Sequence, residues 1–121
     1  MLKRVYALHG FLGSPSDWEC FAPENLGVDQ LIAIDRGQKD FEAPGSFLMG
    51  YSLGGRIALH LLLEQPTYWK GAIIISAHPG LTSEEERKSR LAKDQEWAKR
   101  FVEEPWEKVL NAWNSQPIFR A

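Results

Sequence analysis

Four short apolar runs, each bounded by turn residues, are spread over the first two thirds of the chain. They read RVYAL, LIAI, FLMGY and AIIIS, at residues 4–8, 31–34, 47–51 and 72–76. Strands that are buried on both faces of a parallel sheet have such a continuous apolar composition, whereas strands with one solvent-exposed face alternate between apolar and polar residues. The pattern therefore predicts four parallel strands.

A helical periodicity follows the third run. The segment 53–64 carries apolar residues at helical spacing and stops before Pro66. These residues are Ile57, Leu61 and Leu62. A shorter helical segment is expected at 17–22, after a Ser-Pro-Ser sequence. Strands with an intervening helix predict the α/β fold class.

The last third of the chain has helical patterns and no further strand pattern. Ser83 and Glu86 have the spacing of a capping box, at the start of a helix expected over 84–102. Pro105 is expected in the first turn of another helix, whose apolar residues recur at i, i+3, i+4 and i+7 and should pack on the sheet. They are Trp106, Val109, Leu110 and Trp113.

Composition places few restrictions on function. The 121 residues are 44% hydrophobic and 25% charged, which is ordinary for a soluble globular protein. The change of pattern divides them into a sheet core at 1–81 and a helical lid at 82–121. A net charge of −2 argues against a nucleic-acid partner. The first residues have the pattern of neither a signal peptide nor a membrane span, so a cytoplasmic location is expected.

Cys20 is the single cysteine, which excludes an internal disulfide and a multi-cysteine metal site. We interpret it as a buried or incidental thiol. No metal and no cofactor is expected.

A candidate nucleophile lies between the third apolar run and the helix that follows it. Residues 50–54 read G-x-S-x-G, and Ser52 would occupy a tight strand-to-helix turn with its hydroxyl above the sheet. The backbone N–H of Leu53 and the helix dipole would then stabilise an oxyanion. A chance motif in a glycine-rich turn is the alternative.

A second glycine-rich segment, residues 9–13 or HGFLG, ends the first strand. Such a loop allows the backbone N–H of Phe11 to face the same oxyanion as a second donor. Glycine-rich loops after strands are common, so this loop indicates an oxyanion site only in combination with the serine motif.

The order of these two motifs resembles the α/β-hydrolase superfamily, and the chain looks like the N-terminal part of that fold followed by lid helices. A more specific similarity is to the 2-succinyl-6-hydroxy-2,4-cyclohexadiene-1-carboxylate synthase (MenH) family. It extends over nearly the whole chain and is carried by YSLGGR at 51–56, HPGL at 78–81, EER at 85–87, Arg90, QEW at 95–97, Arg100, Phe101, Glu104, Pro105, Trp113 and QPIF at 116–119.

This resemblance implies a lyase that eliminates pyruvate from a small polyanionic substrate, a succinyl-enolpyruvyl-hydroxycyclohexene carboxylate. Ser52 would be the active-site serine, acting with a histidine, and Phe11 and Leu53 would give the oxyanion N–H groups. Arg56 and Arg90 would bind substrate carboxylates. The pocket would be lined by Tyr51, Trp113 and Phe119.

Other interpretations of the same residues stay open. Arg87 and Arg90 also fit an ion-pair ladder along the lid helix with Glu84, Glu86 and Asp94. A general carboxylesterase or thioesterase would share the serine turn and the oxyanion loop but needs no lid arginines. A third hypothesis is a binding module without catalysis.

The serine requires a base, and three histidines are available. His60 lies about 12 Å of helical rise from Ser52, which is out of reach. His9 is better explained as part of the oxyanion loop, whereas contact of His78 with the serine is conceivable. In the family the acid and the histidine follow the lid, so neither can be named in this chain.

We favour an incomplete family member over a naturally reduced protein. Either would leave the fourth strand as an open sheet edge, through which a homo-oligomer could form. The connection at 36–46 is also near the lower limit for a crossover between parallel strands. It is too short for a covering helix, so one sheet face is expected to lie partly bare beside Val5, Ala7, Ile32 and Ile34.

Overall fold

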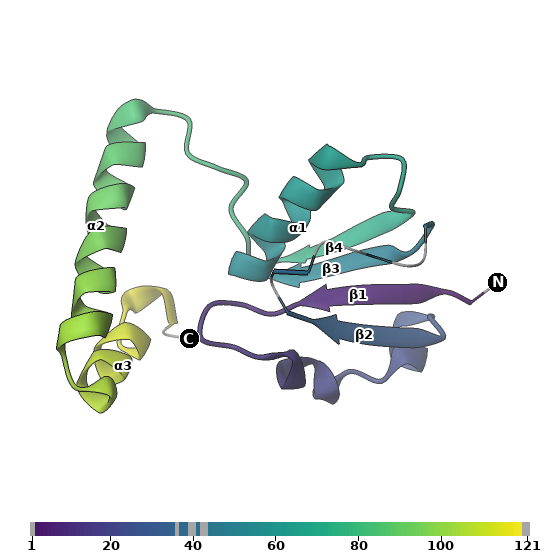
Figure 1. Cartoon of the computed structure of the whole chain (residues 1–121), viewed down its shortest axis with the longest axis horizontal. Helices are drawn as coiled ribbons and strands as arrows, with labels where there is room; N and C mark the ends of the chain where they lie inside the picture. Colours follow the sequence, from purple (N-terminus) through teal and green to yellow (C-terminus); the bar gives the residue numbers. More distant parts are fainter. Residues whose placement is uncertain (1, 36, 39–40, 42–43, 120–121) are drawn as a thin grey trace. The chain divides into compact units, whose positions relative to one another are not determined.

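The computed structural model describes residues 2–35, 37–38, 41 and 44–119. The chain forms two compact units, residues 1–79 and 80–121. The first unit contains the sheet and the second is helical (Figure 1). The boundary lies two residues before the expected start of the lid, and the role of the second unit as a lid stays a prediction.

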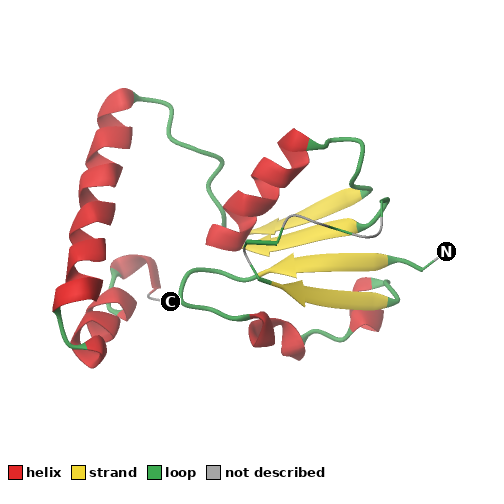
Figure 2. Cartoon of the chain, viewed as in Figure 1, coloured by secondary structure: helices red, strands yellow, loops and turns green. Residues whose placement is uncertain are grey.

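The sheet of the first unit has the four expected parallel strands. They are β1 (Arg4–Leu8), β2 (Gln30–Ile34), β3 (Phe47–Tyr51) and β4 (Gly71–Ile75). Their order is β2-β1-β3-β4, and all neighbouring pairs run parallel, as the arrows in Figure 2 show. The predicted bounds are confirmed to within one residue. Strand β4 therefore forms one edge of the sheet, as expected.

Helix α1 (Leu53–Glu64) packs on one face of this sheet through its apolar side, as its periodicity predicts. Ala58 is fully buried there, among side chains that alternate along the strands. The buried core of this face consists of Tyr6, Leu8, Ile34, Leu48, Ala58 and Trp69.

Two short 3₁₀ helices follow β1, η1 (Pro15–Cys20) and η2 (Pro23–Leu26). They replace the helical segment expected at 17–22. Trp18 of η1 is buried against the opposite face of the sheet, with Val5, Ala7 and Met49. Cys20 is exposed, so only the interpretation as an incidental thiol remains.

The expectation of a partly bare sheet face is wrong for the described residues. Val5 and Ala7 are buried beneath Trp18, whereas on the other face Ile34 is buried and Ile32 is partly buried. Helix α1 and a group of aromatic rings together cover that face: the ring centroids of Phe41 and Trp69 are 4.9 Å apart. They come from the crossover and from the turn before β4. Residues 36, 39–40 and 42–43 of the crossover lie outside the described residues.

The second unit contains α2 (Glu84–Glu103), α3 (Trp106–Asn114) and η3 (Pro117–Phe119). The predicted cap of α2 is confirmed, because Ser83 Oγ accepts a hydrogen bond of 3.1 Å from the backbone N–H of Glu86. Pro105 occupies the N-cap of α3 and not its first turn, a difference of one position. Among the described residues, no helix combines the length and the apolar character needed to cross a membrane.

The apolar face of α3 is only partly as expected. Val109 is fully buried and Trp113 is half-buried, but Trp106 is 57% exposed, so its predicted burial is wrong. Trp113 lies in a cluster of rings with two residues of α2, at centroid distances of 5.0 Å to Trp97 and 5.8 Å to Phe101. Packing of this face on the sheet stays a prediction.

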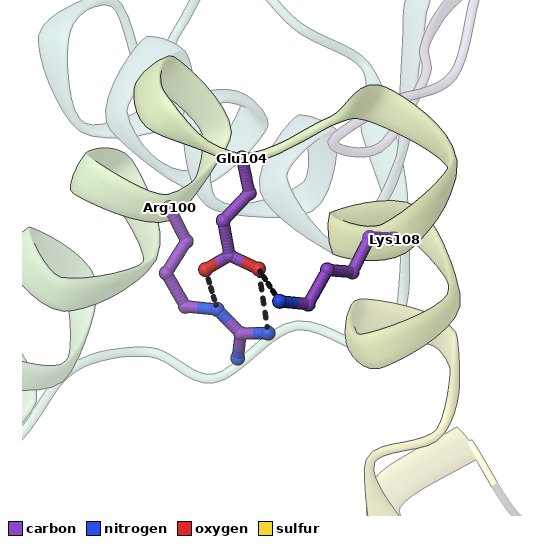
Figure 3. Close-up of polar contacts among 3 residues, drawn as sticks. All are labelled: Arg100, Glu104 and Lys108. Carbon is purple, nitrogen blue, oxygen red and sulfur yellow. Dashed lines mark hydrogen bonds and ion pairs between the residues drawn. The ribbon is translucent and has the colours of Figure 1, made fainter.

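Three charged side chains surround the turn between α2 and α3 (Figure 3). Arg100 Nε donates to Glu104 Oε2 at 2.7 Å, and its Nη2 to Oε1 at 3.3 Å. Lys108 Nζ lies 3.9 Å from the same carboxylate. The hydrogen bond from Arg100 lowers the pKa of Glu104, and the same bond raises the pKa of Arg100.

Candidate active site

Ser52 lies in a sharp turn between β3 and α1. Its backbone has φ 53° and ψ −115°, a conformation that residues with a side chain rarely adopt. Its N–H donates to the carbonyl of Ile75 at 2.9 Å, which continues the sheet ladder, and its carbonyl accepts from the N–H of Arg56 at 3.1 Å, which starts the helix. The predicted strand-to-helix turn is therefore present, and the role of Ser52 as nucleophile stays a prediction.

Close packing of the first turn of α1 fixes this geometry. A Cβ on Gly54 would collide with the carbonyl oxygens of Leu8 and His9, at the end of β1. Only glycine permits this approach between two backbones. The start of α1 is thus pressed against the segment that leads into the loop 9–13.

The loop 9–13 lies beside the serine, as the paired motifs predict. A Cβ on Gly10 would be 3.4 Å from Ser52 Cβ and 3.0 Å from Cδ1 of Tyr51. The N–H of Gly13 donates to the carbonyl of Gly10 at 3.1 Å, which closes a tight turn. Phe11 is 42% exposed in this turn. Its N–H, and that of Leu53, stay predicted oxyanion donors.

The three histidines have different environments. His9 is only 5% exposed, and its Nδ1 is 2.9 Å from the carbonyl oxygen of Gly10. It serves the loop, as the sequence suggested. His60 is exposed on α1, about 12 Å of helical rise from Ser52, so it is out of reach of the serine. His78 follows β4 and is exposed.

Arg56 and Tyr51 lie on either side of Ser52 in sequence, and both are exposed. Arg56 Nη1 donates to the carbonyl of His78 at 2.9 Å, across the gap between α1 and the end of β4. A cation is therefore held at the same edge of the sheet as the serine. Tyr51 is 44% exposed and contacts the loop through the Gly10 backbone.

The two arginines of α2 make different contacts. Arg90 Nε donates to Asp94 Oδ1 at 2.9 Å, with both side chains more than half exposed, so the ladder interpretation accounts for it in this structure. Arg87 makes no such pair in the described contacts: its Nε donates to the carbonyl of Leu81 at 2.9 Å and its Nη2 to that of Thr82 at 3.3 Å. Binding of a substrate carboxylate by Arg90 stays a prediction.

The predicted pocket residues of the second unit lie side by side. The ring centroids of Trp113 and Phe119 are 6.2 Å apart, and Phe119 is 50% exposed. Their contact gives one continuous aromatic surface within the second unit. The described residues contain no cluster of His, Cys, Asp and Glu that could hold a metal ion.

Sequence reasoning missed a hollow in the first unit, next to Tyr51. Its volume is about 270 Å³, and it is mainly apolar. It is lined by His9, Asp17, Trp18, Phe21, Tyr51 and Ile75. The signal that could have found it is the presence of an acid and two aromatic residues at 17–21, shortly after the loop 9–13, which lies beside Ser52.

Residues 44–114 match the family model described as the alpha/beta hydrolase fold. This is more than half of the chain, so the chain belongs to the alpha/beta hydrolase fold family. The match and the four parallel strands confirm the predicted fold class.

The matches to individual proteins are more specific than the match to the family. The 2-succinyl-6-hydroxy-2,4-cyclohexadiene-1-carboxylate synthase of Enterobacter sp. (strain 638) is 48% identical over an alignment of 136 residues, covering 94% of this chain and 53% of that protein. The enzyme of the same name from Klebsiella pneumoniae subsp. pneumoniae is 42% identical over 134 residues, covering 93% and 53%. The chain spans about half the length of the curated relatives it matches.

A solved structure shares the fold. The structure of MenH from S. aureus has a TM-score of 0.82 with this chain at 23% sequence identity, covering 98% of this chain and 54% of that one. The chain is thus homologous to part of the MenH enzymes, and the arrangement of its strands and helices corresponds to part of their fold.

Proposed function

We propose that this chain carries the serine-containing part of a MenH-like lyase, which eliminates pyruvate from a succinyl-enolpyruvyl-hydroxycyclohexene carboxylate in menaquinone biosynthesis. The observation that carries the proposal is the strained, positive-φ backbone of Ser52 between β3 and α1, with the Gly10 backbone against its Cβ. The relatives named as synthases of the corresponding product support it.

In this proposal Ser52 acts together with a histidine, and the N–H groups of Phe11 and Leu53 receive the developing negative charge. Arg56, held at the serine edge by its bond to the His78 carbonyl, attracts a carboxylate of the substrate. Arg90 binds a second carboxylate by exchanging its exposed partner Asp94 for the ligand.

The test is release of pyruvate from the substrate by the purified full chain, followed with a coupled pyruvate assay. Replacement of Ser52 by Ala should lower the rate at least about 100-fold, the effect typical of losing a group that acts in the transition state. Thr67→Ala is the control, since Thr67 is exposed in the turn before β4, at the opposite end of that strand from the serine turn. Pyruvate release at the rate of a blank without protein would contradict the proposal for this chain.

A general carboxylesterase or thioesterase is the second candidate. The apolar hollow of about 270 Å³ beside Tyr51 favours it, because such a surface suits an uncharged acyl group better than a polyanion. Turnover of neutral p-nitrophenyl esters, unchanged by Arg56→Ala and by Arg90→Ala, would select this candidate over the lyase.

A binding module without catalysis is the third candidate. Its support is that His9 is committed to the loop and His60 is remote from Ser52. Calorimetry would then detect binding of a succinyl-type carboxylate without any turnover, whereas pyruvate release would eliminate this candidate.

A further inference from the structure

Backbone strain in the described residues is concentrated at one edge of the sheet. Three residues other than glycine have a positive φ there: Leu12 at 65°, Ser52 at 53° and Ser76 at 51°. Leu12 lies in the loop after β1, Ser52 directly follows β3, and Ser76 directly follows β4. The carboxyl ends of parallel strands meet at the same edge, and strained residues tend to be retained where they serve a function.

Ser52 and Ser76 occupy equivalent positions, each directly after one of two adjacent strands. Tyr51 and Ile75 are the last residues paired in register between β3 and β4, so each serine is the next residue along its strand. The N–H of Ser52 donates to the carbonyl of Ile75 at 2.9 Å, which holds the two exits together. Paired strands are separated by about 4.8 Å, so the two serines lie within reach of one bound ligand.

The segment after Ser76 is fixed on the first turn of α1. A Cβ on Gly55 would lie 2.6 Å from the Cβ of Ala77, so the helix and this segment touch directly. One residue further on, the carbonyl of His78 accepts the bond of 2.9 Å from Arg56. Ser76 is thus an exposed hydroxyl residue on a backbone that is held against the serine turn.

Glycine would remove the strain of a positive φ at this position, yet the chain has a serine. We propose that Ser76 is a ligand-binding residue of the serine site, whose hydroxyl donates a hydrogen bond to a carboxylate or carbonyl oxygen of the molecule bound at Ser52. A neutral donor suits an anionic ligand, whereas a carboxylate at the same place would repel it. This inference rests on the serine site of the proposed function and extends it to the exit of β4.

The test uses the full chain, with succinate as the probe ligand and calorimetry as the measurement. Ser76→Ala and Ser76→Gly should each weaken succinate binding about 10-fold, the effect of losing one hydrogen bond to a charged group. Ser76→Gly should at the same time raise the Tm by a few degrees, because it relieves the positive φ, while Ser76→Ala should leave the Tm nearly unchanged. Thr67→Ala should alter neither quantity.

Each outcome is decisive. Unchanged succinate binding in both Ser76 variants, with binding lost in Arg56→Ala, would overturn the role of Ser76 and leave the serine site intact. Weaker binding accompanied by a lower Tm in Ser76→Gly would show a structural role and also overturn it. Wild-type chain that fails to bind succinate would overturn the inference as stated, and the pyruvate assay would still test the proposed function separately.

Discussion

The serine turn of the first unit and the helix pair of the second unit are held by different kinds of contact. Ser52 is fixed by main-chain groups, through its bond to Ile75 and the approach of Gly54 to the end of β1. The pair α2–α3 is held by side chains: the rings of Trp97 and Trp113 pack together, and Lys108 of α3 lies 3.9 Å from the carboxylate of Glu104 at the end of α2. Side chains can adjust to a change, but packed backbones cannot. Substitutions in the serine turn should therefore lower stability more than substitutions in the pair α2–α3.

Replacing Gly54 by Ala should give the largest effect, and it tests the rigid side of the comparison. The added methyl group would collide with the carbonyl oxygens of Leu8 and His9, which cannot move without disturbing β1. We expect a loss of about 3 kcal/mol in the free energy of unfolding, measured by urea denaturation. Gly37→Ala is the matched control, because a Cβ there meets nothing within 4 Å. Equal losses in the two variants would contradict the steric account.

Replacing Val109 by Ala tests the second unit in the same assay. Val109 is fully buried, so removing two methyl groups should cost about 2 kcal/mol of unfolding free energy. The near-ultraviolet circular dichroism of the Trp97 and Trp113 cluster should weaken with it. Val102→Ala is the control, since Val102 is 85% exposed on α2. A loss in the control as large as in Val109→Ala would show that burial in this unit does not determine its stability.

Ser52→Gly should act in the opposite direction, because it removes a positive φ that serine tolerates poorly. We expect a gain of about 1 kcal/mol in unfolding free energy together with loss of any activity, the combination typical of a strained functional residue. Ser115→Gly is the comparison, since Ser115 has φ −86° at the end of α3 and should lose stability. Destabilisation by Ser52→Gly would argue against stored strain in the turn.

The same distinction explains what the sequence could predict of the fold. The strands and α1 are specified by local patterns, such as the run FLMGY and the helical spacing of Ile57 and Leu61, and they occur where expected. Coverage of the sheet depends on contacts between distant segments. The short crossover predicted that one face would lie partly bare, but Trp18 is buried on one face and Trp69 on the other. These contacts join residues that are far apart in the sequence, so local periodicity does not predict them.

The candidate site shows the same limit. The turn at Ser52 follows from glycine spacing between a strand and a helix, which is local information. The spacing of charged residues did not predict the hydrogen bonds from Arg87 to the carbonyls of Leu81 and Thr82. A guanidinium donates to backbone carbonyls as well as to carboxylates, so the sequence alone does not determine its acceptor. The hollow beside Tyr51 could not be predicted locally either, because it is lined by residues far apart in the sequence, such as Phe21 and Tyr51.

The smallest expected effect concerns the charged contact at the turn between α2 and α3. Because Arg100 lowers the pKa of Glu104, the carboxylate is held more strongly in the folded chain than in the unfolded chain. Its contribution to stability is present at neutral pH, above the unfolded Glu value of about 4.3, and is lost as the pH falls through the lowered folded value. The wild type should therefore lose part of its helical circular dichroism below that pH.

Glu104→Gln should remove this step and leave a weaker hydrogen bond from Arg100 that does not titrate. Glu103→Gln is the matched control, because Glu103 precedes Glu104 on α2, is exposed, and should retain the step. High salt should reduce the difference between wild type and Glu104→Gln, since the pair is partly open to solvent. An acid transition that is identical in Glu104→Gln and in Glu103→Gln would show that the ion pair does not stabilise the turn, and that the ring cluster holds the two helices without it.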